Sequence, residues 1–365
     1  MTIKGDRRER GVVVVTGGAG YIGCVLVPRL LELGYGVRVL DRLFFGSNGL
    51  KPCLDRIELV SGDLRCPPSG LLKGAEAIIN LGGLSAEPAA EYNPEANRSM
   101  NTEGVKVLAL EAKRLGVRRF IQASSGSIYD VGAGNPEKDS LQDESTPVAP
   151  FRVYSITKRD AEKILVELAD PDFCPVMLRQ GSVYGYSPRM RFDLVVNAFV
   201  RDAMTRGYVV LHNGGQMWRP ILSIKDAVEA YVTVLEAPES QVRGQIFNAL
   251  NENVRISELA LRVRKVLADL GIACDIRPDY VPRNLRSCQA NGRRFRETFQ
   301  FEFRYSVEDA VKDLVERIRS DAFPDIHHPR YHNILWMDTI EEAHRLSGGI
   351  GSSTDIPPVA AGAGR

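Results

Sequence analysis

A glycine-rich turn near the N-terminus constrains the fold of this chain more than any other feature. Residues 11–16 (GVVVVT) have the pattern of a buried strand, and residues 21–33 have the pattern of a helix. The sequence TGGAGYIG joins them and carries Gly17, Gly20 and Gly23 at intervals of three. Glycines permit a tight turn and let a phosphate approach the backbone, while the helix N-terminus supplies free N–H groups. This segment therefore predicts a strand–turn–helix unit that binds a pyrophosphate.

The next predicted strand, residues 37–41, ends in Asp41, 18 residues after Gly23. A carboxylate at this place can accept hydrogen bonds from the ribose diol of an adenosine. It favours NAD over NADP as the cofactor, because it would repel a 2′-phosphate. The neighbouring Arg42 leaves NADP open as an alternative.

Strand and helix patterns alternate through the first half of the chain. Further strands are predicted at residues 57–60, 77–81, 120–123 and 176–179, and long helices at 94–115 and 151–168. This alternation indicates a parallel sheet covered by helices on both faces. The predicted fold class is a doubly wound α/β Rossmann sheet with a smaller α+β C-terminal substrate domain.

The second half of the chain has a mixed pattern. Helices are predicted at residues 193–206, 224–236 and 256–270, and short strands at 208–211 and 245–248. We expect a dinucleotide-binding domain over residues 1–180, to which the chain returns around 215–248. A mainly substrate-binding domain is expected over 181–345, followed by a flexible tail at 346–365 that is rich in Gly, Ser, Ala and Pro.

Composition excludes several other classes of protein. The 47 basic and 46 acidic residues leave a net charge of +1, which argues against nucleic-acid binding. Six cysteines without a C-x-x-C pair predict neither a zinc site nor a disulfide framework. The chain contains no apolar run long enough to cross a membrane and no signal peptide pattern, so a cytoplasmic location is expected.

Two clusters of side chains receive a structural interpretation. The basic run at residues 293–304 is interleaved with Phe and is expected to form an amphipathic surface strand or turn. His327, His328 and His332 lack partner carboxylates at metal-ligand spacing, so we interpret them as surface histidines and predict no metal site.

A candidate catalytic group follows from the motif Y-x-x-x-K at Tyr154 and Lys158, which lies inside a predicted helix. A spacing of four places both side chains on one face of the helix. A Lys cation near a phenol stabilises the phenolate, so the Tyr can act as a base. Ser125 lies in SSGSIY at the end of the strand at 120–123, and strand ends line the ligand crevice of such a sheet.

These motifs occur in one order along the chain: TGGAGYIG, the strand-end Asp41, GDL at 62–64, NTEG at 101–104, SSGSIY, YSITK and LRQGSVYG. With them the chain resembles the extended short-chain dehydrogenase/reductase family, in its nucleotide-sugar epimerase/dehydratase branch, over about residues 11–320. The resemblance implies NAD as cofactor, a nucleotide sugar as substrate and a homodimer built from the helices at 94–115 and 151–168.

The resemblance also implies roles for individual residues. Ser125, Tyr154 and Lys158 match the catalytic Ser/Thr, the acid/base and its activating cation. The matches to cofactor-binding positions are Gly17, Gly20, Tyr21, Ile22, Gly23, Asp41, Asp63, Leu64, Leu81, Gly82, Gly83, Asn101 and Lys158. The matches to substrate-binding positions are Ser125, Ser182, Asn197, Arg219 and Arg286. A solvated surface arginine is a competing interpretation for Arg286, and a loop with Arg189 and Arg191 is a further candidate for binding a diphosphate.

Departures from the family pattern reduce the number of reactions that the resemblance leaves open. Family dehydratases and decarboxylases carry acidic residues just after the catalytic Ser/Thr, whereas this chain has Gly126 and Ser127. The expected function is therefore an NAD-dependent sugar-nucleotide epimerase. An NAD(P)H-dependent keto-sugar-nucleotide reductase uses the same hydride site and stays open as an alternative. A non-catalytic dinucleotide sensor is a third possibility, which the intact Ser–Tyr–Lys set disfavours.

Overall fold

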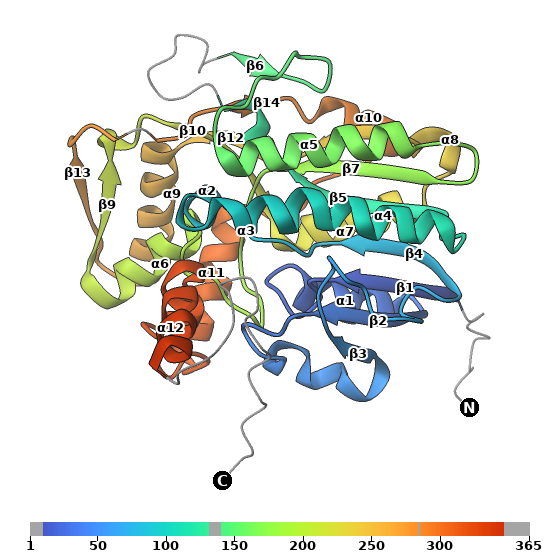
Figure 1. The fold of residues 1–365 in the computed structure, drawn as a ribbon. Helices are drawn as coiled ribbons and strands as arrows, with labels where there is room; N and C mark the ends of the chain where they lie inside the picture. The colour runs from blue at the N-terminus through green and yellow to red at the C-terminus, as the bar shows by residue number, and fades with distance from the viewer. Residues whose placement is uncertain (1–9, 131–139, 284, 347–365) are drawn as a thin grey trace, which may run out of the picture.

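A seven-stranded parallel sheet forms the centre of the molecule (Figure 1). The computed structural model describes residues 10–130, 140–283 and 285–346, so the predicted tail lies outside the described residues from 347 onward. The strand order is β11-β7-β5-β4-β1-β2-β3. The strands are β1 (Arg10–Thr16), β2 (Tyr35–Asp41), β3 (Glu58–Ser61), β4 (Ala75–Asn80), β5 (Arg119–Ser125), β7 (Cys174–Gln180) and β11 (Gln245–Ala249). The order reverses at β1, which opens a crevice at the carboxyl ends there. The predicted doubly wound α/β fold is confirmed.

Helices cover both faces of this sheet (Figure 1). On one face lie α4 (Gly104–Arg114) and α5 (Val153–Leu168), and on the other α1 (Gly23–Glu32) and α7 (Ile224–Glu236). Successive residues of β1 point to opposite faces, so Val13 and Val15 join one core cluster and Val14 joins the other. Burial on both faces explains why this strand is an unbroken run of valines.

The helix predicted over 94–115 consists of three joined segments. These are α3 (Pro94–Arg98), a π-helical turn at Ser99–Glu103 and α4. The π turn places Asn97 and Asn101 so that both amides donate to the backbone oxygen of Leu84, at 3.0 and 2.9 Å. Such turns are frequent at functional sites, and this one fixes the loop that follows β4.

The second half of the chain adds short sheets and helices beside the carboxyl edge of the main sheet (Figure 1). Its strands are β8 (Ser182–Tyr184), β9 (Tyr208–His212), β10 (Trp218–Ser223), β12 (Glu252–Arg255), β13 (Asp275–Asp279) and β14 (Gln289–Ala290), which pairs with β6 (Leu141–Gln142). The remaining α-helices are α2 (Glu87–Tyr92), α6 (Val195–Arg206), α8 (Glu239–Val242), α9 (Ile256–Asp269), α10 (Arg293–Phe299), α11 (Val307–Arg319) and α12 (Asn333–Leu346). Because α7 and β11 return to the main sheet, chain segments far apart in sequence meet at its crevice.

The expectation of a surface strand or turn at residues 293–304 is wrong for its first part. Residues 293–299 form helix α10, and Phe295 is fully buried. Its ring centroid lies 4.9 Å from that of Phe299 and 6.1 Å from that of Phe247 on β11. The aromatic residues of this run are therefore core residues, because the main sheet ends in a strand that they cover.

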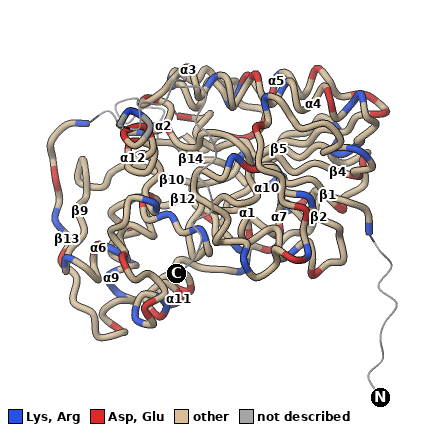
Figure 2. The backbone as a smooth tube through the Cα atoms, turned by 60° about the horizontal axis from the view of Figure 1, so that its bottom comes forward, with Lys and Arg blue, Asp and Glu red and all other residues tan. Residues whose placement is uncertain are grey.

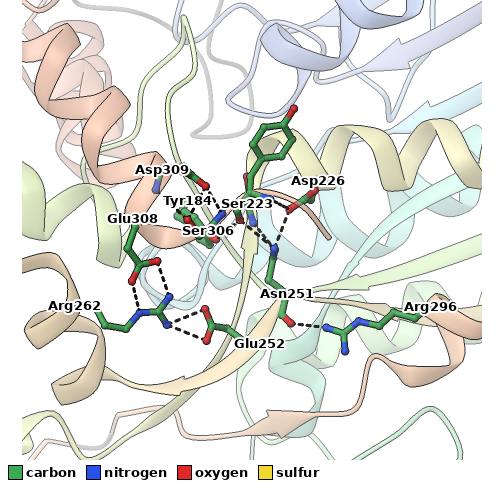
Figure 3. Close-up of polar contacts among 11 residues, drawn as sticks. Tyr184, Ser223, Asp226, Asn251, Glu252, Arg262, Arg296, Ser306, Glu308 and Asp309 are labelled. Atoms are coloured by element: carbon green, nitrogen blue, oxygen red, sulfur yellow. Dashed lines mark hydrogen bonds and ion pairs between the residues drawn. The ribbon is translucent and has the colours of Figure 1, made fainter. Parts of the chain in front are cut away.

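A buried carboxylate joins the C-terminal segment to the main sheet (Figure 3). Asp226 lies in the first turn of α7 and accepts from the backbone N–H groups of Arg304 and Tyr305, at 3.0 and 3.1 Å. It also accepts from the amide of Asn251 at 2.9 Å, as Figure 3 shows. These contacts fix the strand-like segment that leads into α11.

The described part of the chain has neither a marked separation of opposite charges nor a helix that could span a membrane. Basic and acidic residues are interspersed along the tube in Figure 2. In the described part of the chain, none of the helices has the length and apolar character needed to cross a membrane. The same residues contain no group of three His, Cys, Asp or Glu side chains that could hold a metal ion. All six cysteines are free thiols.

Candidate active site

A cleft opens at the carboxyl edge of the main sheet. The sequence-predicted residues that line it are Gly17, Gly20, Tyr21, Ile22, Gly23, Asp41, Leu64, Leu81, Gly82, Gly83, Ser125, Tyr154, Lys158, Ser182, Arg189, Arg191 and Arg286. Fold topology thus brings the glycine turn, the Ser–Tyr–Lys set and the substrate candidates Ser182 and Arg286 to one cavity.

Ser125, Tyr154 and Lys158 converge at the centre of the cleft. Ser125 ends β5, while Tyr154 and Lys158 lie one turn apart on α5. The Ser125 hydroxyl lies near the Tyr154 phenol and lowers its pKa, and the Lys158 ammonium lies 5.7 Å from the centroid of the Tyr154 ring. Lys158 also donates to the backbone oxygen of Ala123 at 2.9 Å, which fixes its direction. An alcohol, a phenol and an ammonium therefore face one point, where a reacting hydroxyl group can bind.

Burial changes the acidity of these groups. It lowers the pKa of Lys158 to about 8 and raises the pKa of the Tyr154 phenol. The positive charge of Arg286 opposes the rise in the pKa of Tyr154, whereas the carboxylate of Glu87 adds to it. The phenol is therefore protonated in the free protein. Positive charge near the phenol lowers this pKa and favours the phenolate.

The glycine turn packs directly against the loop after β4. Gly17 has φ +68°, and a Cβ atom there would lie 2.8 Å from the backbone nitrogen of Gly82. A Cβ atom at Gly23 would lie 2.4 Å from the backbone oxygen of Gly18. Side chains at both places would collide with backbone. The glycines therefore hold the turn beneath the cleft with the N-terminus of α1 directed toward it.

Asp41 is held at the rim of the cleft by two backbone groups. Its carboxylate accepts from the N–H of Ala19 at 3.0 Å and from that of Leu43 at 2.8 Å. The neighbouring Arg42 forms an ion pair with Asp63 at 3.1 Å. Arg42 is thus engaged on the Asp63 side, while the Asp41 carboxylate lines the cleft.

The structure does not place Asp63 or Asn101 on the cleft wall. Asp63 is bound by Arg42 and by Arg65, whose guanidinium donates to it at 2.6 Å. Asn101 accepts from the backbone N–H of Leu84 at 3.0 Å and lies behind that loop. Both residues hold the segments that line the cleft, and their cofactor contacts stay predictions.

Asn197 and Arg219 also lie behind the wall. Asn197 is fully buried, accepts from the N–H of Gly185 at 2.9 Å and donates to the Tyr21 hydroxyl at 3.1 Å. Arg219 donates to the backbone oxygens of Trp218 and Arg286. The structure therefore brings neither side chain to the cavity.

The sequence interpretation missed Glu87. This buried residue accepts from the Ser155 hydroxyl at 2.7 Å and from the Tyr154 N–H at 3.2 Å. It takes the place of an N-cap for α5, where Arg152 makes no side-chain cap. The preceding Ala86 has φ +79° and lines the cleft. No local signal identifies Glu87, because its partner helix begins more than sixty residues later.

Three buried polar atoms on the cleft wall have no partner in the described structure. They are Ser127 Oγ, Arg189 Nε and Arg286 Nε. Buried polar groups are normally paired, so these atoms fit a ligand that carries phosphate and hydroxyl groups. Together with the glycine turn and Asp41, they fit a dinucleotide and a second anionic molecule.

Three features together define the extended short-chain dehydrogenase/reductase class. They are a parallel sheet whose strand order reverses at β1, a glycine turn beneath the crevice and a Ser–Tyr–Lys set. Comparison with known families agrees. A profile of the NAD dependent epimerase/dehydratase family matches residues 13–249, and the chain belongs to that family.

Individual relatives share the fold and part of the sequence. UDP-glucuronic acid decarboxylase 1 of Arabidopsis thaliana is 29% identical over 64% of this chain and 53% of its own length. UDP-glucose 4-epimerase 3 of Oryza sativa subsp. japonica is 30% identical over 48% of this chain and 50% of its own. The solved structure of MoeE5 in complex with UDP-glucuronic acid and NAD has a TM-score of 0.71 at 25% identity, covering 85% of this chain and 99% of that one. This chain therefore spans about half the length of the two curated relatives described.

Proposed function

We propose that this protein is an NAD-dependent sugar-nucleotide epimerase. The observation that carries the proposal is the convergence of Ser125, Tyr154 and Lys158 in a cleft that the glycine turn and Asp41 also line. Relatives in the same family include a UDP-glucose 4-epimerase, which supports the reaction class.

The chemistry assigns one task to each side chain. NAD, when bound, would accept a hydride from the sugar and return it. Tyr154 accepts the proton of a sugar hydroxyl. It returns this proton to the sugar oxygen after the keto sugar has rotated in the site to present its other face. Ser125 holds the sugar oxygen during the transfer. Lys158 places its positive charge near the phenol and favours the phenolate.

The cofactor residues form a continuous path along the cleft. The glycine turn and the N-terminus of α1 would hold the pyrophosphate, and Asp41 would accept from the adenosine ribose. Leu64, Gly82 and Gly83 provide apolar and backbone surface beside it. A carboxylate at Asp41 favours NAD over NADP.

The substrate side of the cleft is basic. Arg286 donates to the Ser182 hydroxyl at 3.3 Å and keeps Nε unpartnered. A guanidinium at this place suits the diphosphate of a nucleotide sugar. Structures of relatives with UDP-glucuronic acid support this class of substrate.

The region after Ser125 separates epimerisation from elimination. Gly126 and Ser127 stand there, and neither can supply the acid–base pair that loss of water or carbon dioxide needs. The Ser127 hydroxyl is buried without a partner, so it can bind a sugar hydroxyl. Return of the hydride to the oxidised carbon, and of the proton to the oxygen on that carbon, is the reaction that these groups support.

The purified protein should convert a UDP-hexose or UDP-hexuronate to its epimer without net consumption of added NAD. Incubation with a panel of UDP-, GDP- and dTDP-sugars, followed by NMR of the products, tests this. Net oxidation of NADH or NADPH with a keto sugar nucleotide would favour the reductase instead. Binding of dinucleotide without conversion of any sugar would favour the sensor.

We further infer a homodimer in the cytoplasm. Helices α4 and α5 lie side by side on one outer face of the sheet (Figure 1). Apolar side chains on this face are exposed, including Val107 at 40%, Leu110 at 45% and Val166 at 44%. Packing of two such faces would remove these side chains from water.

A further inference from the structure

The C-terminal helix α12 forms a wall of the coenzyme cleft. Asn333 and Met337 line the cavity together with Asp41 and the glycine turn. Residue 333 follows the end of the family match, at residue 249, by more than eighty residues. The wall is therefore an addition to the part of the chain that defines the family.

Asn333 connects α12 to both sides of the cleft. Its side-chain oxygen accepts from the Arg189 guanidinium at 2.7 Å, and its amide nitrogen lies 3.4 Å from the Ser85 hydroxyl. Arg189 is buried and stacks over the Phe45 ring at 3.6 Å. One asparagine thus joins the loop after β2, the loop after β4 and the loop before α6.

Other residues of α12 make separate contacts with the same loops. The Trp336 indole N–H donates to the backbone oxygen of Phe44 at 2.5 Å. Met337 is buried against Leu84 and Met100. These contacts lie on one side of the helix, whereas Leu335 is half exposed. The helix therefore closes one side of the cleft.

The segment before α12 is fixed more firmly than α12 itself. Phe192, Phe323 and Tyr331 pack ring against ring, and the Phe192 N–H donates to the backbone oxygen of Tyr331 at 2.9 Å. By contrast, three polar side chains, Asn333, Trp336 and Glu341, and one small apolar cluster hold α12 beside the cleft. Such a helix can open as a unit about residue 332 while the rest stays folded.

We propose that α12 is a strap that retains the coenzyme, so that NAD leaves only when this helix opens. The inference rests on the proposed function, in which an epimerase regenerates its own NAD in each turnover. An enzyme of that kind gains from a closed coenzyme site, whereas a reductase must exchange its coenzyme every cycle. The structure thus places a retention device where the epimerase reaction needs one.

The test measures how fast bound NAD dissociates from the full-length protein. The protein is loaded with radiolabelled NAD, an excess of unlabelled NAD is added, and retained label is followed by rapid filtration. In the triple variant N333A/W336F/M337A, dissociation should be at least about tenfold faster, because two polar contacts and one buried side chain are lost. The control L335A changes the exposed side of the same helix and should release NAD at the wild-type rate.

Folding is checked by circular dichroism and thermal unfolding of each variant. Asn333→Ala alone leaves the apolar contacts in place and should give an intermediate rate of NAD dissociation. This single variant tests the proposal if the triple variant fails to fold. Dissociation within twofold of wild type in the folded variants would overturn the strap but leave the epimerase proposal standing. A wild-type protein that binds no NAD would overturn both.

Discussion

At the scale of single residues, the site is a balance between burial and charge. Tyr154 and Lys158 are both buried, which raises the pKa of the phenol and lowers that of the ammonium to about 8. Arg286 and Arg191 oppose the first effect, and Glu87 adds to it. Two predictions test this balance.

Tyr154→Phe removes the phenol oxygen and leaves the ring in place. Turnover should fall about 100- to 10,000-fold, because the sugar hydroxyl loses its base. The affinity for NAD, measured by calorimetry, should change less than twofold. Tyr129→Phe serves as the control, because that hydroxyl bonds Arg179 and Asn248 away from the cleft. Normal turnover in Tyr154→Phe would remove Tyr154 from the chemistry.

Glu87→Gln keeps an acceptor for the Ser155 hydroxyl but removes a negative charge near the phenol. The pKa of Tyr154 should fall, so the acidic limb of the pH profile of kcat/KM should move to lower pH by about one unit. The groups that face the phenol, Arg286, Arg191 and Lys158, are unchanged. Glu87→Ala also removes the cap of α5 and should lower the free energy of unfolding by about 1 kcal/mol. An unmoved pH limb in Glu87→Gln would show that the residue is structural only.

At the scale of elements, the loop after β2 carries the proposed contact with the cofactor, and helices α4 and α5 carry the proposed dimer face. The loop after β2 carries Asp41, and its carboxylate orders both this loop and the glycine turn through Leu43 and Ala19. Helices α4 and α5 cover one face of the sheet and expose apolar side chains outward. Each feature carries one prediction.

Asp41→Ala should weaken NAD binding by about 10- to 100-fold, because a charged acceptor for the ribose is lost. NADP binding should change much less, because its 2′-phosphate no longer meets a carboxylate. Asp41→Asn keeps the size of the side chain and should give an intermediate loss of NAD affinity. Titration of both dinucleotides by fluorescence measures the ratio, and equal losses for the two would argue against the ribose contact.

Leu110→Glu places a charge in the middle of the exposed apolar face of α4. Sedimentation velocity should show a dimer for the wild type and a monomer for the variant, because the buried charge has no partner. Leu261→Glu changes a similarly exposed leucine on α9 and should leave the dimer intact. A wild-type monomer would contradict the proposed assembly.

At the scale of the whole molecule, the C-terminal half is attached to the main sheet at a few defined places. Asp226 is one of them, since it accepts two backbone N–H groups and the Asn251 amide. Arg262 adds a bridge between Glu252 and Glu308. These contacts hold the segment before α11 against α7 and join α9 to β12 and α11.

Asp226→Ala should lower the free energy of unfolding by about 1 to 3 kcal/mol, because three partly buried donors lose their acceptor. Urea denaturation measures the change. Asp226→Asn keeps one acceptor oxygen and should lose less. Equal stability of the Ala variant and the wild type would show that the segment at 304–305 is held by other contacts.

The sequence alone determined the order of the elements and the candidate catalytic group. The valine run, the glycine turn, Asp41 and the Y-x-x-x-K pair are local patterns, and local patterns report the strand, turn and helix that contain them. They predicted the parallel sheet and the position of the glycine turn beside the cleft. In a doubly wound sheet such a turn lies at the carboxyl end of the first strand, where the strand order reverses.

Tertiary structure alone decided which side chains reach the cavity. Asn197 and Arg219 have the residue types of ligand contacts, but neither lines the cavity: the Asn197 amide is fully bonded behind the wall, and one guanidinium nitrogen of Arg219 donates to backbone oxygens. Glu87 and Asn333 reach the site from segments without any motif. The physical reason is that hydrogen bonds and burial at this cleft join residues far apart in sequence, and a linear pattern contains no record of which distant groups become neighbours.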